Sequence, residues 1–376
     1  MGAAAAIAQP LNVLSMPEVP RAAKLSASRS GTHAAEECHR SMELRNRGDL
    51  EGSLRSADLA VLEDPNNALV WHTRCEAHLN LQEWDALLKD STRLLELDET
   101  DAAGWGFRAA ARLNKGDYEG AVSDCSQAIG RDARSPWVWS CRGCARLHKQ
   151  DFPGAVEDLT QAVTRDPTRA KDWERRGLAR LWQQQLIAAA SDFSEAIRLD
   201  ARMSTSWGHR ALVRAMQSDI LGSYADAERA LRINPYEASA SAARAWCKIG
   251  QADYAGALED ANKALDHSDD SLALAWAVRA QAHTGLANYK DAEYDCSKAL
   301  EYDPHLLEAL VCRGTARMYR GDLEGALKDC SQALQMDEEA AEVAGVHAVL
   351  ERAHVSLRTM QAWQSPPTVS EWVQVR

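Results

Sequence analysis

The sequence predicts an all-α protein, an α-solenoid of nine tandem helix–turn–helix units. Five tryptophans stand 34 residues apart along the 376-residue chain, and a sixth follows 69 residues after the fifth. They are Trp71, Trp105, Trp139, Trp173, Trp207 and Trp276. Small residues and prolines recur with the same period. A repeat of this length holds one pair of helices, and stacked pairs bury a continuous core.

The recurring small residues define the limits of the units. Four places after the tryptophan position stand Cys75, Ala109, Gly143, Gly177, Ala211, Ala245, Ala280 and Gly314. Alanines recur at Ala60, Ala128, Ala162, Ala196, Ala230, Ala264, Ala299 and Ala333, and Pro65, Pro167, Pro235 and Pro304 mark unit ends. The predicted units are 34–67, 68–101, 102–135, 136–169, 170–203, 204–237, 238–272, 273–306 and 307–340, with one extra residue near Leu272.

Each unit is predicted to contain two helices joined by a short turn. In the fourth unit, residues 139–147 keep large and small side chains on one helical face. Gly116 and Asp117 suit the turn of the third unit because both tolerate its backbone angles. The second helix of that unit has small residues on its inner face, namely Ala121, Cys125 and Ala128.

Three units depart from the tryptophan pattern. Glu37, Ser241 and Leu310 occupy its place in units one, seven and nine. Units one and nine are terminal, where atypical residues are expected. For unit seven, beside the extra residue, we expect a local irregularity.

The two ends of the chain are predicted to lie outside the repeats. Residues 1–33 are expected to form a flexible tail, with a transit peptide as the alternative because of their Arg and Ser content. Residues 341–364 place apolar side chains three and four apart, which predicts an amphipathic helix that caps the last unit. Its apolar stripe is Val343, Val346, Leu350, Ala353, Leu357 and Met360. Pro366 and Pro367 end this helix and leave 365–376 as a second flexible tail.

The repeat resembles the tetratricopeptide repeat family, which has the same period and the same helix–turn–helix unit. The resemblance extends over residues 34–340 and rests on the Trp, Gly-or-Ala, Ala and Pro positions together. It implies a right-handed superhelix of stacked helix pairs. It also implies a concave groove lined by the first helix of each unit.

An arginine and an aspartate also recur with the period of the repeat. The arginines are Arg40, Arg74, Arg108, Arg142, Arg176, Arg210, Arg244, Arg279 and Arg313, and the aspartates are Asp90, Asp124, Asp158, Asp192, Asp226, Asp260, Asp295 and Asp329. They could bind acidic ligands, but a feature of every unit does not mark one site. We therefore expect half-buried ion pairs between packed helices, which fix register more than they add stability.

The composition excludes several classes of function. With 55 acidic and 43 basic side chains the net charge is −12, which argues against nucleic acid as the main partner. No apolar run reaches the length of a membrane span, so no membrane insertion is expected. The sequence contains no phosphate-binding loop, no nucleophile elbow and no zinc-protease motif. We expect a soluble protein that is not an enzyme and needs no cofactor.

One cluster has the residue types of a metal site. Cys141, Cys144 and His148 fall on roughly one helical face, and thiolates with imidazole are zinc ligands. A second cysteine pair at matching spacing is missing, and both cysteines occupy places that take small residues. We expect packing residues here and no metal. The odd number of cysteines, nine, favours reduced thiols and a cytoplasmic or nuclear location.

Binding residues are expected on the first helices. Three tryptophans, Trp137, Trp182 and Trp246, lie off the repeated tryptophan place, and aromatic anchors are typical of peptide grooves. Trp139 and Trp173, which lie on that place, are expected to fill the helix pairs. The candidate groove residues are Trp137, Ser140, Cys144, His148, Lys171, Glu174, Arg175, Trp182, Met216, Trp246, Met318 and Tyr319.

These features predict a non-enzymatic scaffold that binds a partner peptide or helix in a mostly apolar groove. One alternative is a chaperone cofactor, because Lys171 and Arg175 match one part of the carboxylate clamp found in a subfamily of the repeat. The other clamp positions hold Gly106, Ala110 and Cys141, which lack the required donors. A second alternative is a targeting subunit of an enzyme complex. Partner, process and oligomeric state stay open.

Overall fold

The structure, a computed structural model, describes residues 32–267, 273–336 and 346–364, with the side chains of the last helix described as far as Ser356. It contains nineteen helices and no strand in these ranges. Eighteen of them form nine consecutive pairs, so the predicted all-α repeat array is confirmed. The extra residue near Leu272, the predicted tail at 365–376 and residues 1–31 of the predicted tail at 1–33 lie outside the described ranges, whereas Thr32 and His33 already belong to the first helix.

The chain divides into two compact units at Leu181. Residues 32–180 hold α1 (Thr32–Asn46), α2 (Leu50–Glu63), α3 (Ala68–Leu81), α4 (Trp84–Leu97), α5 (Ala102–Asn114), α6 (Tyr118–Arg131), α7 (Pro136–His148), α8 (Phe152–Arg165) and most of α9 (Ala170–Trp182). Residues 181–364 hold α10 (Leu186–Leu199), α11 (Ser204–Met216), α12 (Ile220–Ile233), α13 (Ala238–Gly250), α14 (Tyr254–Asp266), α15 (Ala273–Gly285), α16 (Tyr289–Tyr302), α17 (Leu307–Arg320), α18 (Leu323–Met336) and α20 (Val346–Gln364).

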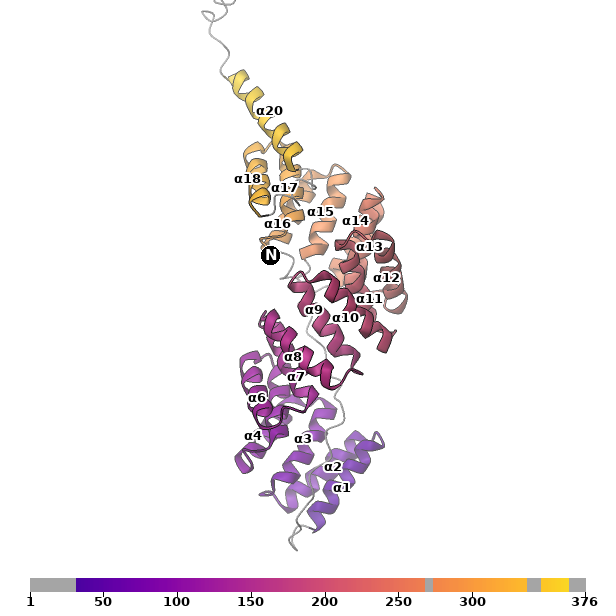
Figure 1. Ribbon diagram of the computed structural model, residues 1–376, viewed down its shortest axis with the longest axis vertical. Helices are drawn as coiled ribbons and strands as arrows, with labels where there is room; N and C mark the ends of the chain where they lie inside the picture. Colours follow the sequence, from indigo (N-terminus) through magenta and orange to yellow (C-terminus); the bar gives the residue numbers. More distant parts are fainter. Residues whose placement is uncertain (1–31, 268–272, 337–345, 365–376) are drawn as a thin grey trace, which may run out of the picture. The chain divides into compact units, whose positions relative to one another are not determined.

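Within each unit the first helices of neighbouring repeats pack against one another. The first helices α1, α3, α5, α7, α11, α13, α15 and α17 also contact the second helices of their own repeats (Figure 1). The contacts α1–α3, α3–α5 and α5–α7 form one layer of first helices in residues 32–180, and α11–α13, α13–α15 and α15–α17 form another in residues 181–364.

The turns between paired helices follow a local rule. An aspartate caps the second helix and its carboxylate accepts a hydrogen bond from the backbone N–H of a glycine three residues later. This pairing occurs at Asp49–Gly52, Asp117–Gly120, Asp151–Gly154, Asp219–Gly222, Asp253–Gly256 and Asp322–Gly325. The turn residue before the cap adopts a left-handed conformation, as Gly116 does at φ 82°. The predicted Gly-Asp turn is confirmed.

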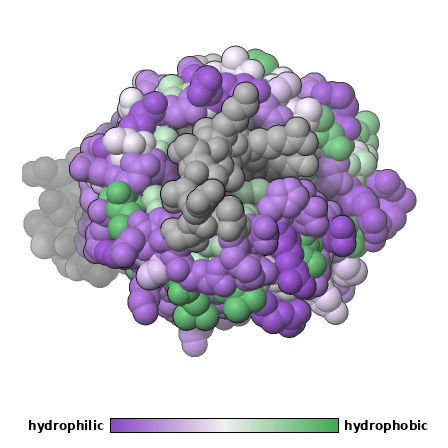
Figure 2. All heavy atoms as spheres, turned by 90° about the horizontal axis from the view of Figure 1, so that it is seen from below, coloured by the Kyte–Doolittle hydropathy of each residue, from purple (hydrophilic) through white to green (hydrophobic). Residues whose placement is uncertain are grey.

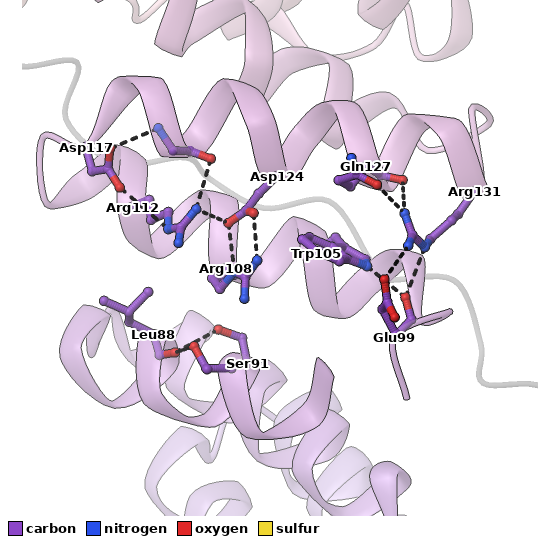
Figure 3. A network of polar contacts seen from close by, with 12 residues as sticks. Leu88, Ser91, Glu99, Trp105, Arg108, Arg112, Asp117, Asp124, Gln127 and Arg131 are labelled. Atoms are coloured by element: carbon purple, nitrogen blue, oxygen red, sulfur yellow. Dashed lines mark hydrogen bonds and ion pairs between the residues drawn. The ribbon is translucent and has the colours of Figure 1, made fainter. Parts of the chain in front are cut away.

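The recurring arginines and aspartates form the ion pairs expected between paired helices. Arg108 Nε and Nη2 each lie 2.9 Å from the Asp124 carboxylate, and Arg112 adds a third contact at 3.0 Å (Figure 3). The same two-nitrogen geometry joins Arg74–Asp90, Arg142–Asp158, Arg210–Asp226, Arg244–Asp260, Arg279–Asp295 and Arg313–Asp329. The first unit departs from the expectation, because Arg40 is exposed and lies 3.6 Å from Glu37 of its own helix.

Trp139 and Trp173 are only partly buried, which corrects the expectation that they fill the helix pairs. Trp139 is only partly buried, and its Nε1–H donates to the carbonyl of Ala133 at 2.8 Å. Arg142 and Arg165 lie 5.0 and 4.9 Å from its ring centroid. Figure 3 shows the equivalent Trp105 beside Glu99 and Arg131. These tryptophans therefore fasten the loop between repeats, where cation–π contacts and one hydrogen bond hold them.

The last described helix, α20, packs on α17 and α18. Val346, Val349 and Ala353 are buried, and the two valines join a core cluster with Leu310 and Cys330. Of the other stripe residues, Leu350 packs partly buried against this cluster. Val343 lies outside the described ranges, and the side chains of Leu357 and Met360 are not described. The buried residues are those that a helix covering the ninth repeat would bury.

Candidate functional site

The candidate site consists of first-helix residues that lie at predicted groove positions or join neighbouring first helices, and we name this set the first-helix face. In residues 32–180 it includes Arg45, His72, Glu76, His148 and Lys171. In residues 181–364 it includes Leu212, Met216, Trp246, Ile249, Met318 and Tyr319. Figure 2, which views the molecule from below along its long axis rather than onto the first helices, shows mostly hydrophilic side chains with hydrophobic ones in small, separate patches.

A charged network crosses the first three repeats. Arg45 on α1 forms an ion pair with Glu76 on α3, and His72 lies one turn before Glu76 with Nε2 and Oε1 3.7 Å apart. His72 Nδ1 lies 2.9 Å from Oδ2 of Asp101, the residue that caps α5. The network therefore links three consecutive first helices through side chains that are largely buried. The prediction of a mostly apolar groove is wrong for this part of the face.

The pKa values in this network follow from its geometry. Burial alone would lower the pKa of His72, but the hydrogen bonds to Asp101 and Glu76 outweigh it and raise the value to about 9. Burial would raise the pKa values of Glu76 and Asp101, yet their contacts with His72 lower both. His72 is therefore a cation at neutral pH and holds two carboxylates ionised.

The candidate residues of α7 are mostly core residues. Trp137 is 3% exposed and packs against Phe107, while Ser140 and Cys144 are also buried. The expectation that these three side chains face a ligand is wrong for the described structure. Cys141 and Cys144 are packing residues, as expected. His148 stays partly open and stacks on Tyr118, with ring centroids 4.5 Å apart.

The match to the carboxylate clamp fails at Arg175. Its guanidinium is 3% exposed, and Nη1 lies 3.3 Å from Ser140 Oγ and 3.4 Å from Asp172 Oδ1. Ser140 Oγ in turn donates to the same carboxylate oxygen at 2.5 Å. Burial and the charge of Arg175 lower the pKa of His148. Lys171 is partly exposed and Glu174 is buried, so one of the two clamp cations is open to a ligand.

In residues 181–364 the first-helix face is more apolar. Trp246 and Ile249 on α13 are partly buried and pack over a cluster that includes Ala245 and Val278. Met216 at the end of α11 is also partly open, and Leu212 beside it is buried. Trp182, the last residue of α9, is partly buried. This part of the face thus combines an accessible aromatic side chain with flexible and aliphatic neighbours.

The last repeats carry two stacked tyrosines. Tyr319 is 51% exposed and its ring lies parallel to that of Tyr289 with centroids 4.5 Å apart. Arg352 of α20 donates to its hydroxyl at 3.2 Å. Met318 is partly buried and packs against the cluster below α20. Tyr319 is therefore the most exposed candidate residue, and α20 contacts it.

Solved structures have the same architecture. A chain of the APC/C hetero-tetramer Cut9–Hcn1 is similar to this one at a TM-score of 0.56 and 14% identity, covering 85% of this chain and 76% of that chain. A tetratricopeptide repeat protein from Parabacteroides merdae has a TM-score of 0.50 at 14% identity, covering 67% of this chain and 98% of that one. The chain has the tetratricopeptide repeat fold. No protein-family model matches the sequence, and no curated protein matches it.

The sequence pattern did not identify His72 and Glu76 as parts of the charged network. His72 and Glu76 lie one turn apart on a predicted first helix, but their contacts with Asp101 and Arg45 join three different repeats. The available signal was the His–Glu pair, whose side chains lie one turn apart on a first helix. A membrane-crossing helix is absent from the described residues, since none combines the necessary length with the necessary hydropathy.

Proposed function

We propose that this chain is a non-enzymatic scaffold that binds a segment of a partner protein on its first-helix face, centred on Trp246. The observation that carries the proposal is the surface made by Trp246, Ile249 and Met216. These apolar side chains remain partly open on two first helices that pack against each other. Aromatic residues in such settings are the usual anchors of protein interfaces.

The fold supports this choice over an enzyme. Tetratricopeptide repeat arrays present extended surfaces built from neighbouring repeats, and helix or peptide segments bind such surfaces through spaced apolar anchors. The similar chain of Cut9–Hcn1 is itself part of a hetero-tetramer. Trp182 and Tyr319, in the same compact unit as Trp246, extend the proposal along the face, and Lys171 is proposed separately as a binding residue of the other unit. The cytoplasm is the compartment we assign.

The chaperone-cofactor alternative loses its main support. A carboxylate clamp needs free cationic donors, and Arg175 already contacts Ser140 and Asp172 inside the helix layer. Breaking those contacts would leave Asp172, which is fully buried, with less compensation. A peptide whose only anchor is its terminal carboxylate therefore finds few donors here.

The experiment compares two tryptophans of the same compact unit. Trp246→Ala removes the proposed anchor, whereas Trp207→Ala removes a tryptophan bonded to the Ala201 carbonyl at 3.1 Å on the repeated place. Partners are isolated with the wild-type chain, identified by mass spectrometry and then titrated as purified proteins. Trp246→Ala should weaken binding by about 2 kcal/mol while Trp207→Ala leaves it unchanged. Equal binding by Trp246→Ala and wild type would refute the proposal.

A further inference from the structure

The turn edge of the repeat array changes character between the two compact units. In residues 32–180, lysines that follow first helices pair with carboxylates at the start of the preceding second helices. These ion pairs are Lys115–Asp85 and Lys149–Glu119. Each one links two neighbouring repeats at the turn edge.

Both partners of this ion pair are replaced between the fifth and sixth repeats and between the sixth and seventh repeats. Two periods after Glu119 stands Ile187, and one period later stands Leu221. Two and three periods after Lys149 stand Gln217 and Gln251. The acidic and the basic residue are therefore replaced together at these positions. Gln217 and Gln251 are the C-cap residues of α11 and α13.

The new side chains are not used by the fold. Ile187 is 83% exposed and Leu221 is 84% exposed, the two largest values among the exposed large hydrophobic residues of the described chain. In the next repeats, Ala252 and Ala255 are exposed at the turn edge, and Leu286 is 39% exposed. We name these five residues the turn-edge strip. Exposed apolar residues that recur along one edge of a repeat array are candidates for an interaction surface.

Two exposed aspartates lie in the turns directly before Leu221 and Ala255 of the turn-edge strip. Asp219 and Asp253 cap α12 and α14, and both stay exposed while they accept backbone N–H bonds from Gly222 and Gly256. Arg214 lies 2.8 Å from Asp226 and 3.7 Å from Asp219, whose side chain nevertheless stays 52% exposed, and Lys248 lies 2.7 Å from Asp260. A second copy of this edge would bring like charges together, so charge complementarity favours a basic partner.

From this pattern we infer that the turn-edge strip binds a segment of a partner protein that carries aliphatic side chains flanked by lysine or arginine. Aliphatic side chains of the segment cover Ile187 and Leu221, while its cations contact Asp219 and Asp253. This surface is separate from the one around Trp246. It gives the chain a second binding site on the edge of the array.

The test uses the full chain and a short fluorescein-labelled amphipathic peptide of leucine and lysine, with a leucine–glutamate peptide as the charge control. One variant installs ion pairs equivalent to Lys115–Asp85 and Lys149–Glu119. It combines Ile187→Glu, Gln217→Lys, Leu221→Glu and Gln251→Lys, which leaves the net charge unchanged. A second variant combines Asp219→Asn and Asp253→Asn, because asparagine also caps helices well. Its matched control combines Asp117→Asn and Asp151→Asn.

Fluorescence anisotropy should show binding of the lysine peptide that weakens by about tenfold or more in the first variant. The Asp219→Asn, Asp253→Asn variant should weaken it by roughly threefold, with no change in the matched control or in Trp246→Ala. The inference is overturned if neither peptide binds, if the glutamate peptide binds equally, or if the matched control weakens binding as much. Self-association in sedimentation velocity that disappears in the first variant would make a second copy the occupant and would also overturn it.

Discussion

The ring of Trp137 stacks on that of Phe107, with centroids 6.1 Å apart, across the contact between α7 and α5. A Cβ atom added at Gly106 would lie 2.5 Å from Trp137 Cη2, so the glycine lets the two first helices approach. Trp139, two residues further along α7, lies instead on the loop side of its helix. The two neighbouring tryptophans therefore have opposite roles, one in the core and one at the repeat junction.

Truncating the two tryptophans should separate these roles. Trp137→Ala removes a buried indole and should lower the free energy of unfolding by about 3–5 kcal/mol. Trp139→Ala loses one hydrogen bond and two cation–π contacts at a partly exposed site, and should cost about 1–2 kcal/mol. Urea denaturation followed by circular dichroism measures both. Equal losses for the two variants would contradict the assignment.

The sequence period predicts the helix pairs, the turns and the Arg–Asp ion pairs because each depends on contacts within or between adjacent helices at fixed separations. It does not show which of Trp137 and Trp139 is buried, since both belong to one helix and the packing partner lies a repeat away. The available signal for the buried position of Trp137 was Gly106, one period before Ser140, because a glycine there leaves room for the indole ring. The network from Arg45 to Asp101 stays hidden because His72 and Glu76 do not recur in the next repeat, where Gly106 and Ala110 stand at their places.

Removing one buried carboxylate should be costly. Asp158 is 1% exposed and binds two arginines, with Arg142 Nη2 at 2.7 Å and Arg146 Nη1 at 3.0 Å. Asp158→Ala leaves both guanidinium groups without this acceptor and should lower the free energy of unfolding by about 3 kcal/mol. The neighbouring Glu157→Ala, at an exposed position of α8, should change it by less than about 0.5 kcal/mol. Chemical denaturation that gives the same midpoint for both variants would show that the ion pair adds nothing.

The charged network should make stability depend on pH through His72. Its folded pKa of about 9 lies above the ordinary value of 6.5, so protonation favours the folded state. This contribution, up to about 3 kcal/mol, is fully present below pH 6.5 and is lost as pH rises through 9. His72→Gln should remove that part of the pH dependence. Melting curves between pH 6 and about 9.5 check it, and parallel profiles for variant and wild type would contradict it.

Two valines of α20 provide a matched test of its role at the end of the array. Val349 is 9% exposed against α17 and α18, whereas Val355 is 62% exposed. Val349→Asp should weaken the contact by about 2 kcal/mol or more and speed amide exchange in α17 and α18. Val355→Asp should leave exchange unchanged. If both variants exchange at the wild-type rate, α20 does not protect the ninth repeat.

The central claim is that a partner segment binds the first-helix face around Trp246. Hydrogen–deuterium exchange of the full chain, with and without the partner identified by purification, tests it most directly. Protection should appear in α11 and α13, whose side chains Met216, Trp246 and Ile249 form the surface, and it should disappear in Trp246→Ala. Protection confined to the second helices, or unchanged in Trp246→Ala, would contradict the account.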